Sequence, residues 1–199
     1  MPFQNRITPL GEIIATPERG LVYGNRGCLH DANGRIRRQW QVKRWISCRL
    51  EFRGWHRASG PMPPNRFTGL FFLDEATAFA AGHRPCAMCR REDYIRFMEI
   101  VREKRAGAID ERLHGERLGP KPEREIASLP DGAFVLVDDS PWLVLGGELL
   151  RWTAGGYAER RPATGGAPLI TPPAVLPVLE SGWSGVVPFL HASADALRI

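Results

Sequence analysis

The sequence predicts an α+β fold, in which an α+β domain over residues 1–125 precedes a β-rich segment over residues 126–199. Three observations favour it. Three consecutive helices are predicted within residues 74–118, short apolar runs separated by turn residues lie on both sides of that stretch, and every cysteine belongs to the N-terminal domain. The C-terminal segment could equally pack onto the first part as one domain.

The composition is that of an ordinary globular protein. A chain of 199 residues can bury a substantial core, and 43% hydrophobic with 25% charged residues are ordinary values. No apolar run approaches the roughly 18 residues of a membrane span. The first residues lack the basic start and apolar core of a secretion signal. We therefore expect a cytoplasmic protein with reduced cysteines and no membrane partner.

Short strands and turns are expected before the helices. Residues 24–27 and 32–34 contain the glycine and asparagine typical of turns. Partial alternation of apolar side chains predicts a strand within residues 40–50. The proline-rich residues 60–64 form a loop that cannot be helical. The apolar run over residues 68–73 is either a short buried strand or the lead-in to a helix.

Helices follow in the middle of the chain. Asp74 is a good N-cap for a helix over residues 75–81, and the glycine that follows can end it in the left-handed conformation. Residues 91–105 carry apolar side chains at helical spacing, which predicts a second helix that stops at Gly107. A third, weaker helix is expected over residues 108–118.

The remaining chain is typical of β structure. The composition changes near residue 125, and beyond it short apolar runs alternate with glycine and aspartate turns. The predicted strands cover residues 133–137, 142–145 and 148–152, with turns at 138–141 and 146–147. Pro172 and Pro173 then open a short helix that ends near Gly182.

The four cysteines are Cys28, Cys48, Cys86 and Cys89. The Cys-x-x-Cys spacing of the last two lets both thiolates converge on one ion, and zinc takes four ligands at tetrahedral corners. Cys48, and either Cys28 or a histidine, would complete the set. Two alternatives to a zinc site remain. Cys86 and Cys89 could form a redox pair, although no βαβ pattern precedes them, and Cys28 and Cys48 could simply fill buried core positions. Three histidines lie near these cysteines in the sequence: His30, His56 and His83. Each of them is, on its own, more typical of a surface or core position than of a metal ligand.

Two segments resemble the metal-binding domain of the Ada family of DNA methyl-damage repair proteins. Residues 72–90, FLDEATAFAAGHRPCAMCR, are similar to that family's helix ending in Ala-Gly-Phe-Arg-Pro-Cys-x-x-Cys. Upstream, residues 45–49, WISCR, are similar to its Gly-Ile-Tyr-Cys-Arg. Together the resemblance covers about residues 40–105, and the Ala-Gly-x-Arg-Pro-Cys-x-x-Cys block is its specific part.

The resemblance implies that Cys48 is a zinc ligand and the methyl acceptor, with Cys86 and Cys89 as further ligands. The family's second cysteine, four residues after the first, is replaced here by Phe52, so the fourth ligand must come from elsewhere. Cys28 is the first choice for this fourth ligand. A histidine is the second choice, with His30 preferred over the others. The family's helix-turn-helix region and its second active-site motif are absent.

The charge is uneven along the chain. Residues 1–66 contain twelve Lys or Arg against four Asp or Glu, a balance of +8, whereas the remainder has a balance of −3. Arginine pairs bidentately with phosphate, so this excess favours DNA as a partner, held through phosphate contacts. Arg49 and Arg84 lie beside the predicted ligands and are the candidate phosphate-binding residues. The alternatives are ordinary surface charge and, for Arg84, an ion pair with an acidic residue of the preceding helix.

Three functions are consistent with these residues. The first is a zinc protein that accepts methyl groups from DNA phosphotriesters on Cys48. The second is a zinc-stabilised module that binds nucleic acid or protein without catalysis, which the neutral Ala87 and Met88 between the paired cysteines favour. The third is a zinc hydrolase, for which His30 and Asp31 supply the usual residue types.

Overall fold

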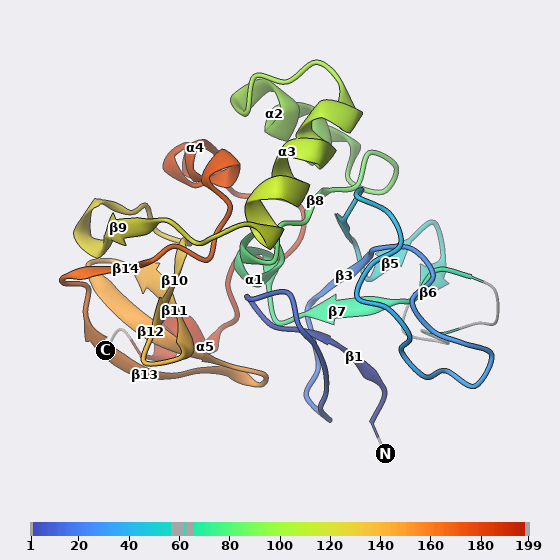
Figure 1. Cartoon of the computed structure of the whole chain (residues 1–199), viewed down its shortest axis with the longest axis horizontal. Coiled ribbons are helices and arrows are strands. Elements are labelled where there is room, and N and C mark those ends of the chain that lie inside the picture. Colours follow the sequence, from blue (N-terminus) through green and yellow to red (C-terminus); the bar gives the residue numbers. More distant parts are fainter. Residues whose placement is uncertain (1, 57–61, 63–65, 198–199) are drawn as a thin grey trace.

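The computed structural model describes residues 2–56, 62 and 66–197, and it confirms the α+β class (Figure 1). A mixed sheet forms the N-terminal part, an antiparallel sheet forms the C-terminal part, and the helices lie between and beside them. In the part of the chain that the structure describes, no helix combines the length and the apolar character needed to cross a membrane.

The N-terminal sheet has the strand order β2-β1-β7-β3-β4-β8. Pairing is antiparallel except between β1 and β7 and between β4 and β8. The strands are β1 (Gln4–Ile7), β2 (Ile13–Ala15), β3 (Val22–Asn25), β4 (Ile46–Cys48), β7 (Leu70–Phe72) and β8 (Arg84–Pro85), beside the hairpin of β5 (Glu51–Phe52) and β6 (Trp55–His56).

Two expectations for this part are sharpened. The apolar run at residues 68–73 is the central strand β7, buried throughout, and not a helix lead-in. The strand expected within residues 40–50 shortens to Ile46–Cys48, because only these residues find a partner strand. The predicted proline loop at residues 60–64 lies largely outside the described residues.

Helix α1 (Glu75–Ala80) begins as expected at Asp74, whose carboxylate accepts hydrogen bonds from the backbone N–H (2.9 Å) and hydroxyl (2.7 Å) of Thr77. Gly82 follows with φ of +76°, a left-handed conformation that glycine adopts without strain. The helix thus has the start and stop that its sequence signals predict.

The second and third helices depart from their predicted limits. Helix α2 (Arg91–Ile100) ends five residues early, because the chain turns at Arg102, which has φ of +56°. Helix α3 (Ala106–Leu118) therefore starts earlier than predicted, and Gly107 lies in its first turn and not after the end of α2.

The C-terminal sheet is an antiparallel meander in the order β10-β11-β12-β13. Asp138 and Asp139 have φ of +50° and +56°, and Gly146 and Gly147 have φ of +59° and +78°. Both predicted turns are therefore tight reversals, although the first is limited to residues 138–139 because β11 already begins at Ser140. The strands are β10 (Phe134–Val137), β11 (Ser140–Leu145), β12 (Glu148–Thr153) and β13 (Gly156–Pro162), beside a pair of β9 (Glu123–Glu125) and β14 (Gly166–Pro168). The short helices are η1 (Ile126–Ser128), η2 (Pro173–Val175), α4 (Leu176–Glu180) and α5 (Ser193–Ala196).

The two parts share a hydrophobic core around α1. Phe79 of α1 and Phe97 of α2 belong to the same buried cluster as Val135 of the C-terminal sheet. Asp74 also accepts hydrogen bonds from the hydroxyl of Tyr157 (2.7 Å) and the backbone N–H of His191 (2.9 Å). Residue 125 therefore marks a change of secondary structure, while side-chain packing continues across it.

Candidate metal centre

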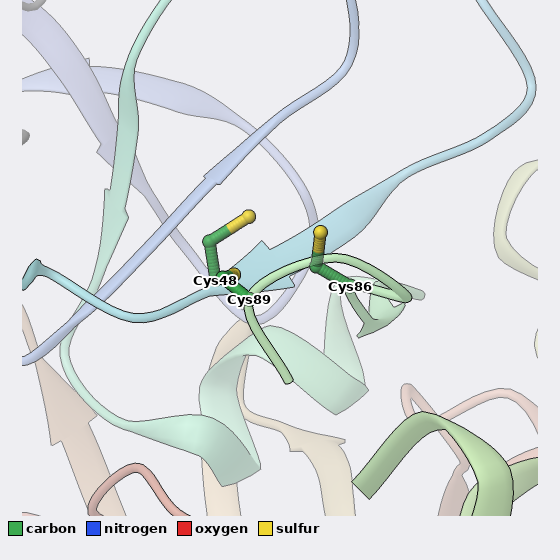
Figure 2. Close-up of side chains that lie close together, drawn as sticks. All are labelled: Cys48, Cys86 and Cys89. Atoms are coloured by element: carbon green, nitrogen blue, oxygen red, sulfur yellow. The ribbon is translucent and has the colours of Figure 1, made fainter. Parts of the chain in front are cut away.

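Three of the four cysteines meet at one end of the N-terminal sheet. Strands β4 and β8 pair in parallel, with Ile46 opposite Arg84 and Ser47 opposite Pro85. The next residue on each strand is a cysteine, so Cys48 and Cys86 lie side by side at the carboxyl ends of the two strands. The turn after Cys86 brings Cys89 to the same place (Figure 2), and the three sulfur atoms lie within 4.8 Å of one another.

Backbone hydrogen bonds hold this turn. The N–H of Cys86 donates to the carbonyl of Ser47 (2.9 Å), and the N–H of Arg90 donates to the carbonyl of Cys86 (3.0 Å). The sulfurs are themselves acceptors: Met88 N–H lies 3.4 Å from Cys86 Sγ, and the Arg49 backbone N–H donates to the sulfur of Cys89. Such donors stabilise thiolate charge and orient the ligand atoms.

The buried guanidinium of Arg90 supports the cluster from behind. Its Nη1 donates to the Ser47 hydroxyl (2.9 Å), its Nε donates to Asp93 (2.8 Å), and it forms an ion pair with Glu75 of α1. Ser47 is the residue before Cys48, so this network holds strand β4 against the turn. The sequence prediction missed Arg90, although its place directly after the Cys-x-x-Cys pair was visible.

The three thiols shift each other's pKa values because they are close together and buried. Hydrogen bonds from Cys48 and Cys89 lower the pKa of Cys86 to about 2. The hydrogen bonds with Cys86 and Cys89, together with burial, raise the pKa of Cys48 well above its usual value. Three adjacent thiols do not all ionise on their own, whereas a bound cation holds each of its sulfur ligands as thiolate.

This donor set fits zinc. A tetrahedral zinc ion with Zn–S bonds of about 2.3 Å places its sulfurs about 3.8 Å apart, which sulfurs already within 4.8 Å reach with small movements. All three cysteines are at least nine-tenths buried. Soft, buried, converging thiolates are the ligands that select zinc over magnesium or calcium.

Cys28 does not join this cluster, although the sequence made it the first choice for the fourth ligand. Cys48 pairs with Tyr23 near the start of β3, and Cys28 follows Tyr23 by five residues, beyond the far end of the ladder. At about 3.3 Å per residue, the chain travels up to about 16 Å over that distance. The backbone N–H of Cys28 donates to the Gln41 side chain (2.7 Å), and its Sγ lies 3.7 Å from the carbonyl oxygen of His30.

The histidines considered as substitutes lie elsewhere. His30 Nδ1 is 2.6 Å from the Thr68 hydroxyl, and His83 is fully buried with Nε2 3.2 Å from Arg26 Nε. The side chain of His56 lies outside the described residues. Among the side chains that the structure describes, the metal-binding group therefore consists of three cysteines, which leaves the fourth tetrahedral position to another donor.

The two candidate phosphate-binding arginines have different surroundings. Arg84 is 2% exposed and pairs bidentately with Asp110 of α3 at 2.8 and 2.9 Å. Arg84 thus forms an ion pair as expected, but its acidic partner lies 26 residues further along the chain and not in the preceding helix. The side chain of Arg49 is exposed, which leaves it the better placed of the two to contact a phosphate.

A cavity of about 710 Å³ opens beside the cysteines, with Cys48 and Cys86 in its wall. Arg44, Ile46 and Cys48 line it because alternate residues along this segment face the same side of the sheet. Large apolar side chains at its rim are unusually exposed: Met88 by 73% and Phe67 by 45%. The sequence prediction named neither this cavity nor Arg44, because both depend on how the strands pair.

Comparison with known proteins adds no relative: no family model, curated protein or solved structure matches the chain significantly. No family is therefore identified, and the likeness to the Ada domain remains a resemblance between short segments. The geometry itself supports a buried three-cysteine cluster able to hold a metal ion such as zinc.

Proposed function

We propose that this is a zinc protein whose metal is held by Cys48, Cys86 and Cys89, and that zinc-bound Cys48 accepts methyl groups from DNA phosphotriesters. The observation that carries the proposal is the convergence of three buried sulfurs beside an open cavity, which Cys48 and Cys86 line. A purely structural zinc site is usually closed by four protein ligands, whereas reactive sites keep a position or a face accessible.

The chemistry is a displacement at carbon. The Cys48 thiolate attacks the methyl carbon of a neutral phosphate triester, forming an S–CH₃ bond while the CH₃–O bond breaks. The bonding electron pair leaves with oxygen, so the products are a thioether and a phosphodiester anion. Zinc supplies a thiolate that stays deprotonated at neutral pH, which is the nucleophilic form of cysteine.

Positive charge around the cavity supports DNA as the substrate. Arg44 and Arg53 line the cavity, and the exposed Arg49 follows Cys48 in the chain. These residues belong to the part of the chain with a charge balance of +8. Contacts of this kind bind the DNA backbone with little sequence preference and weaken steeply with added salt.

A second candidate is a zinc-stabilised binding module without methyl transfer. Two observations favour it: Cys48 is only 2% exposed, and Phe52 stands where the Ada pattern has its second cysteine. In this function zinc contributes folding free energy alone. The hydrolase alternative has less support, because His30 lies against Thr68 and Asp31 pairs with Arg37 at 2.7 Å, neither at the cysteines.

The test is incubation of the zinc-loaded protein with methylphosphotriester DNA, followed by intact mass and peptide mapping. The proposal predicts a gain of one methyl group, located on Cys48. Cys28→Ser is the matched control, and its methylation should equal that of the wild type. Zinc-loaded protein that binds the DNA but gains no methyl group would support the second candidate instead.

A further inference from the structure

Two arginines are buried on the other side of the N-terminal sheet, and neither forms an ion pair within the described part of the chain. Arg26 is fully buried; its Nε contacts His83 (3.2 Å), its Nη1 donates to the Gly11 carbonyl (2.7 Å), and its Nη2 has no hydrogen-bond partner within the described chain. Arg117 of α3 is 8% exposed, and its Nε is likewise unpartnered there.

The neighbours of these arginines are neutral acceptors and an aromatic ring. Arg117 donates to the carbonyls of Gly82 (2.9 Å) and Lys43 (2.6 Å). Both guanidinium carbons lie 3.8 Å from the ring centroid of Trp45, a cation–π arrangement. Neither arginine forms an ion pair among the described residues, whereas the buried Arg84 and Arg90 both do.

Burying two cations without an anion costs free energy. Burial and the nearby charge of Arg117 lower the pKa of Arg26 well below its usual value, and burial lowers the pKa of Arg117 to about 9. Burial and the two arginines also lower the pKa of His83, so the imidazole stays neutral. An anion bound here would offset that cost.

A cavity of about 330 Å³ reaches these arginines. Arg26, Arg117 and Lys121 line it, together with Trp40 and the carboxylate-bearing Glu12. A Cβ placed on Gly11, another lining residue, would lie 3.6 Å from Arg26 Nη2, so the unpartnered nitrogen lies close to the turn that lines the cavity.

This cavity is distinct from the one beside the cysteines, with which it shares no lining residue. Successive residues point to opposite faces of a sheet. Asn25 and Ile46 accordingly line the cysteine cavity, whereas their neighbours Arg26 and Trp45 line this one.

We propose that this second cavity binds a phosphate group at the basic side chains that line it, those of Arg26, Arg117 and Lys121. Three cations against one carboxylate leave a net charge of +2, which complements a phosphate dianion better than a singly charged carboxylate. Guanidinium N–H groups bind phosphate through charge-assisted hydrogen bonds, and Arg26 Nη2 and Arg117 Nε each lack an acceptor among the described residues. Trp40, 37% exposed, offers an apolar surface to an organic group carried by the phosphate.

Calorimetric titration of the zinc-loaded protein tests this, using inorganic phosphate, uridine monophosphate and a 5′-phosphorylated oligonucleotide at equal ionic strength. Wild-type protein should bind at least one of the three. Arg117→Gln and Lys121→Gln should each weaken binding about tenfold or more, because each removes one charge-assisted contact. Arg112→Gln is the matched control on the same helix, with a side chain that is 48% exposed, and should leave affinity unchanged.

The tightest of the three ligands identifies the source of the phosphate: a free anion, a small organic phosphate or a nucleic-acid end. Lys121→Gln keeps the proposal testable if Arg117→Gln fails to fold. Absence of binding by all three phosphates overturns the proposal. Wild-type affinity in folded Arg117→Gln and Lys121→Gln, or equal weakening by Arg112→Gln, overturns it as well.

Discussion

At the scale of single residues, the position of each site residue depends on contacts between distant segments. Cys86 and Cys89 were predictable as a pair from their spacing alone. Cys48 joins them because β4 and β8 pair in parallel, and that register is not visible in the local sequence. The same reason explains why Cys28, an equally plausible ligand by residue type, lies away from the cluster.

Arg84 illustrates how burial changes the meaning of a charged residue. Beside two cysteines in the sequence, it suggested a phosphate contact. In the structure its side chain is 3% exposed and its partner Asp110 10%, so the two form a buried ion pair that joins strand β8 to helix α3. Removing one partner of a buried ion pair is costly, because the remaining charge stays buried without a counter-charge or water to stabilise it.

We therefore expect Asp110→Ala to destabilise the fold by about 3–5 kcal/mol, since it leaves the Arg84 guanidinium buried and unpaired. The measurement is the free energy of unfolding in urea. Glu111→Ala is the matched control on the same helix: its exposed pair with Lys43 should contribute less than about 1 kcal/mol. Equal losses for the two variants would contradict this account of Arg84.

At the scale of elements, tight turns and helix caps were the most predictable features. The aspartate pair at 138–139 and the glycine pair at 146–147 need left-handed backbone, which their residue types tolerate, and both strand reversals lie there. Strand β13 was missed because its exposed face is polar and its sequence is flanked by glycine and proline. Pairing with β12, a tertiary contact, is what makes it a strand.

Asp74 connects an element to the rest of the molecule. Its side chain caps α1 and accepts the Tyr157 hydroxyl, while burial raises the pKa of its carboxyl. A raised carboxyl pKa means that the folded protein binds the proton more tightly than the unfolded chain. This contribution to stability is therefore greatest at low pH and is lost as the pH rises through the folded-state pKa.

We expect Asp74→Ala to cost about 2–4 kcal/mol, because it removes the cap and leaves the buried Tyr157 hydroxyl without its acceptor. Tyr157→Phe removes a single hydrogen bond and should cost about 1 kcal/mol. Thermal and urea unfolding measure the loss of stability in each of the two variants. A larger loss for Tyr157→Phe than for Asp74→Ala would contradict the assignment of the cap.

At the scale of the whole molecule, helix α1 lies between the two sheets and belongs to the core of both parts (Figure 1). The sequence indicated where secondary structure changes, near residue 125. It left open whether apolar side chains pack across that point, because packing partners are set by the three-dimensional arrangement and not by local periodicity.

We accordingly expect residues 1–125 alone to lose cooperative unfolding, since truncation exposes Phe79 and Phe97 and removes the two hydrogen bonds that Tyr157 and His191 donate to Asp74. Circular dichroism during heating measures this. A truncated chain that melts in one sharp transition with its zinc bound would show instead that the N-terminal part is an independent domain.

The central claim is that three cysteines hold zinc while Cys28 does not. X-ray absorption at the zinc edge of the purified full-length protein tests it most directly, because the spectrum counts sulfur neighbours. The account predicts one zinc per chain with three sulfurs at about 2.3 Å and one lighter donor, unchanged in Cys28→Ser. Protein without zinc, or four sulfurs that fall to three in Cys28→Ser, would contradict it.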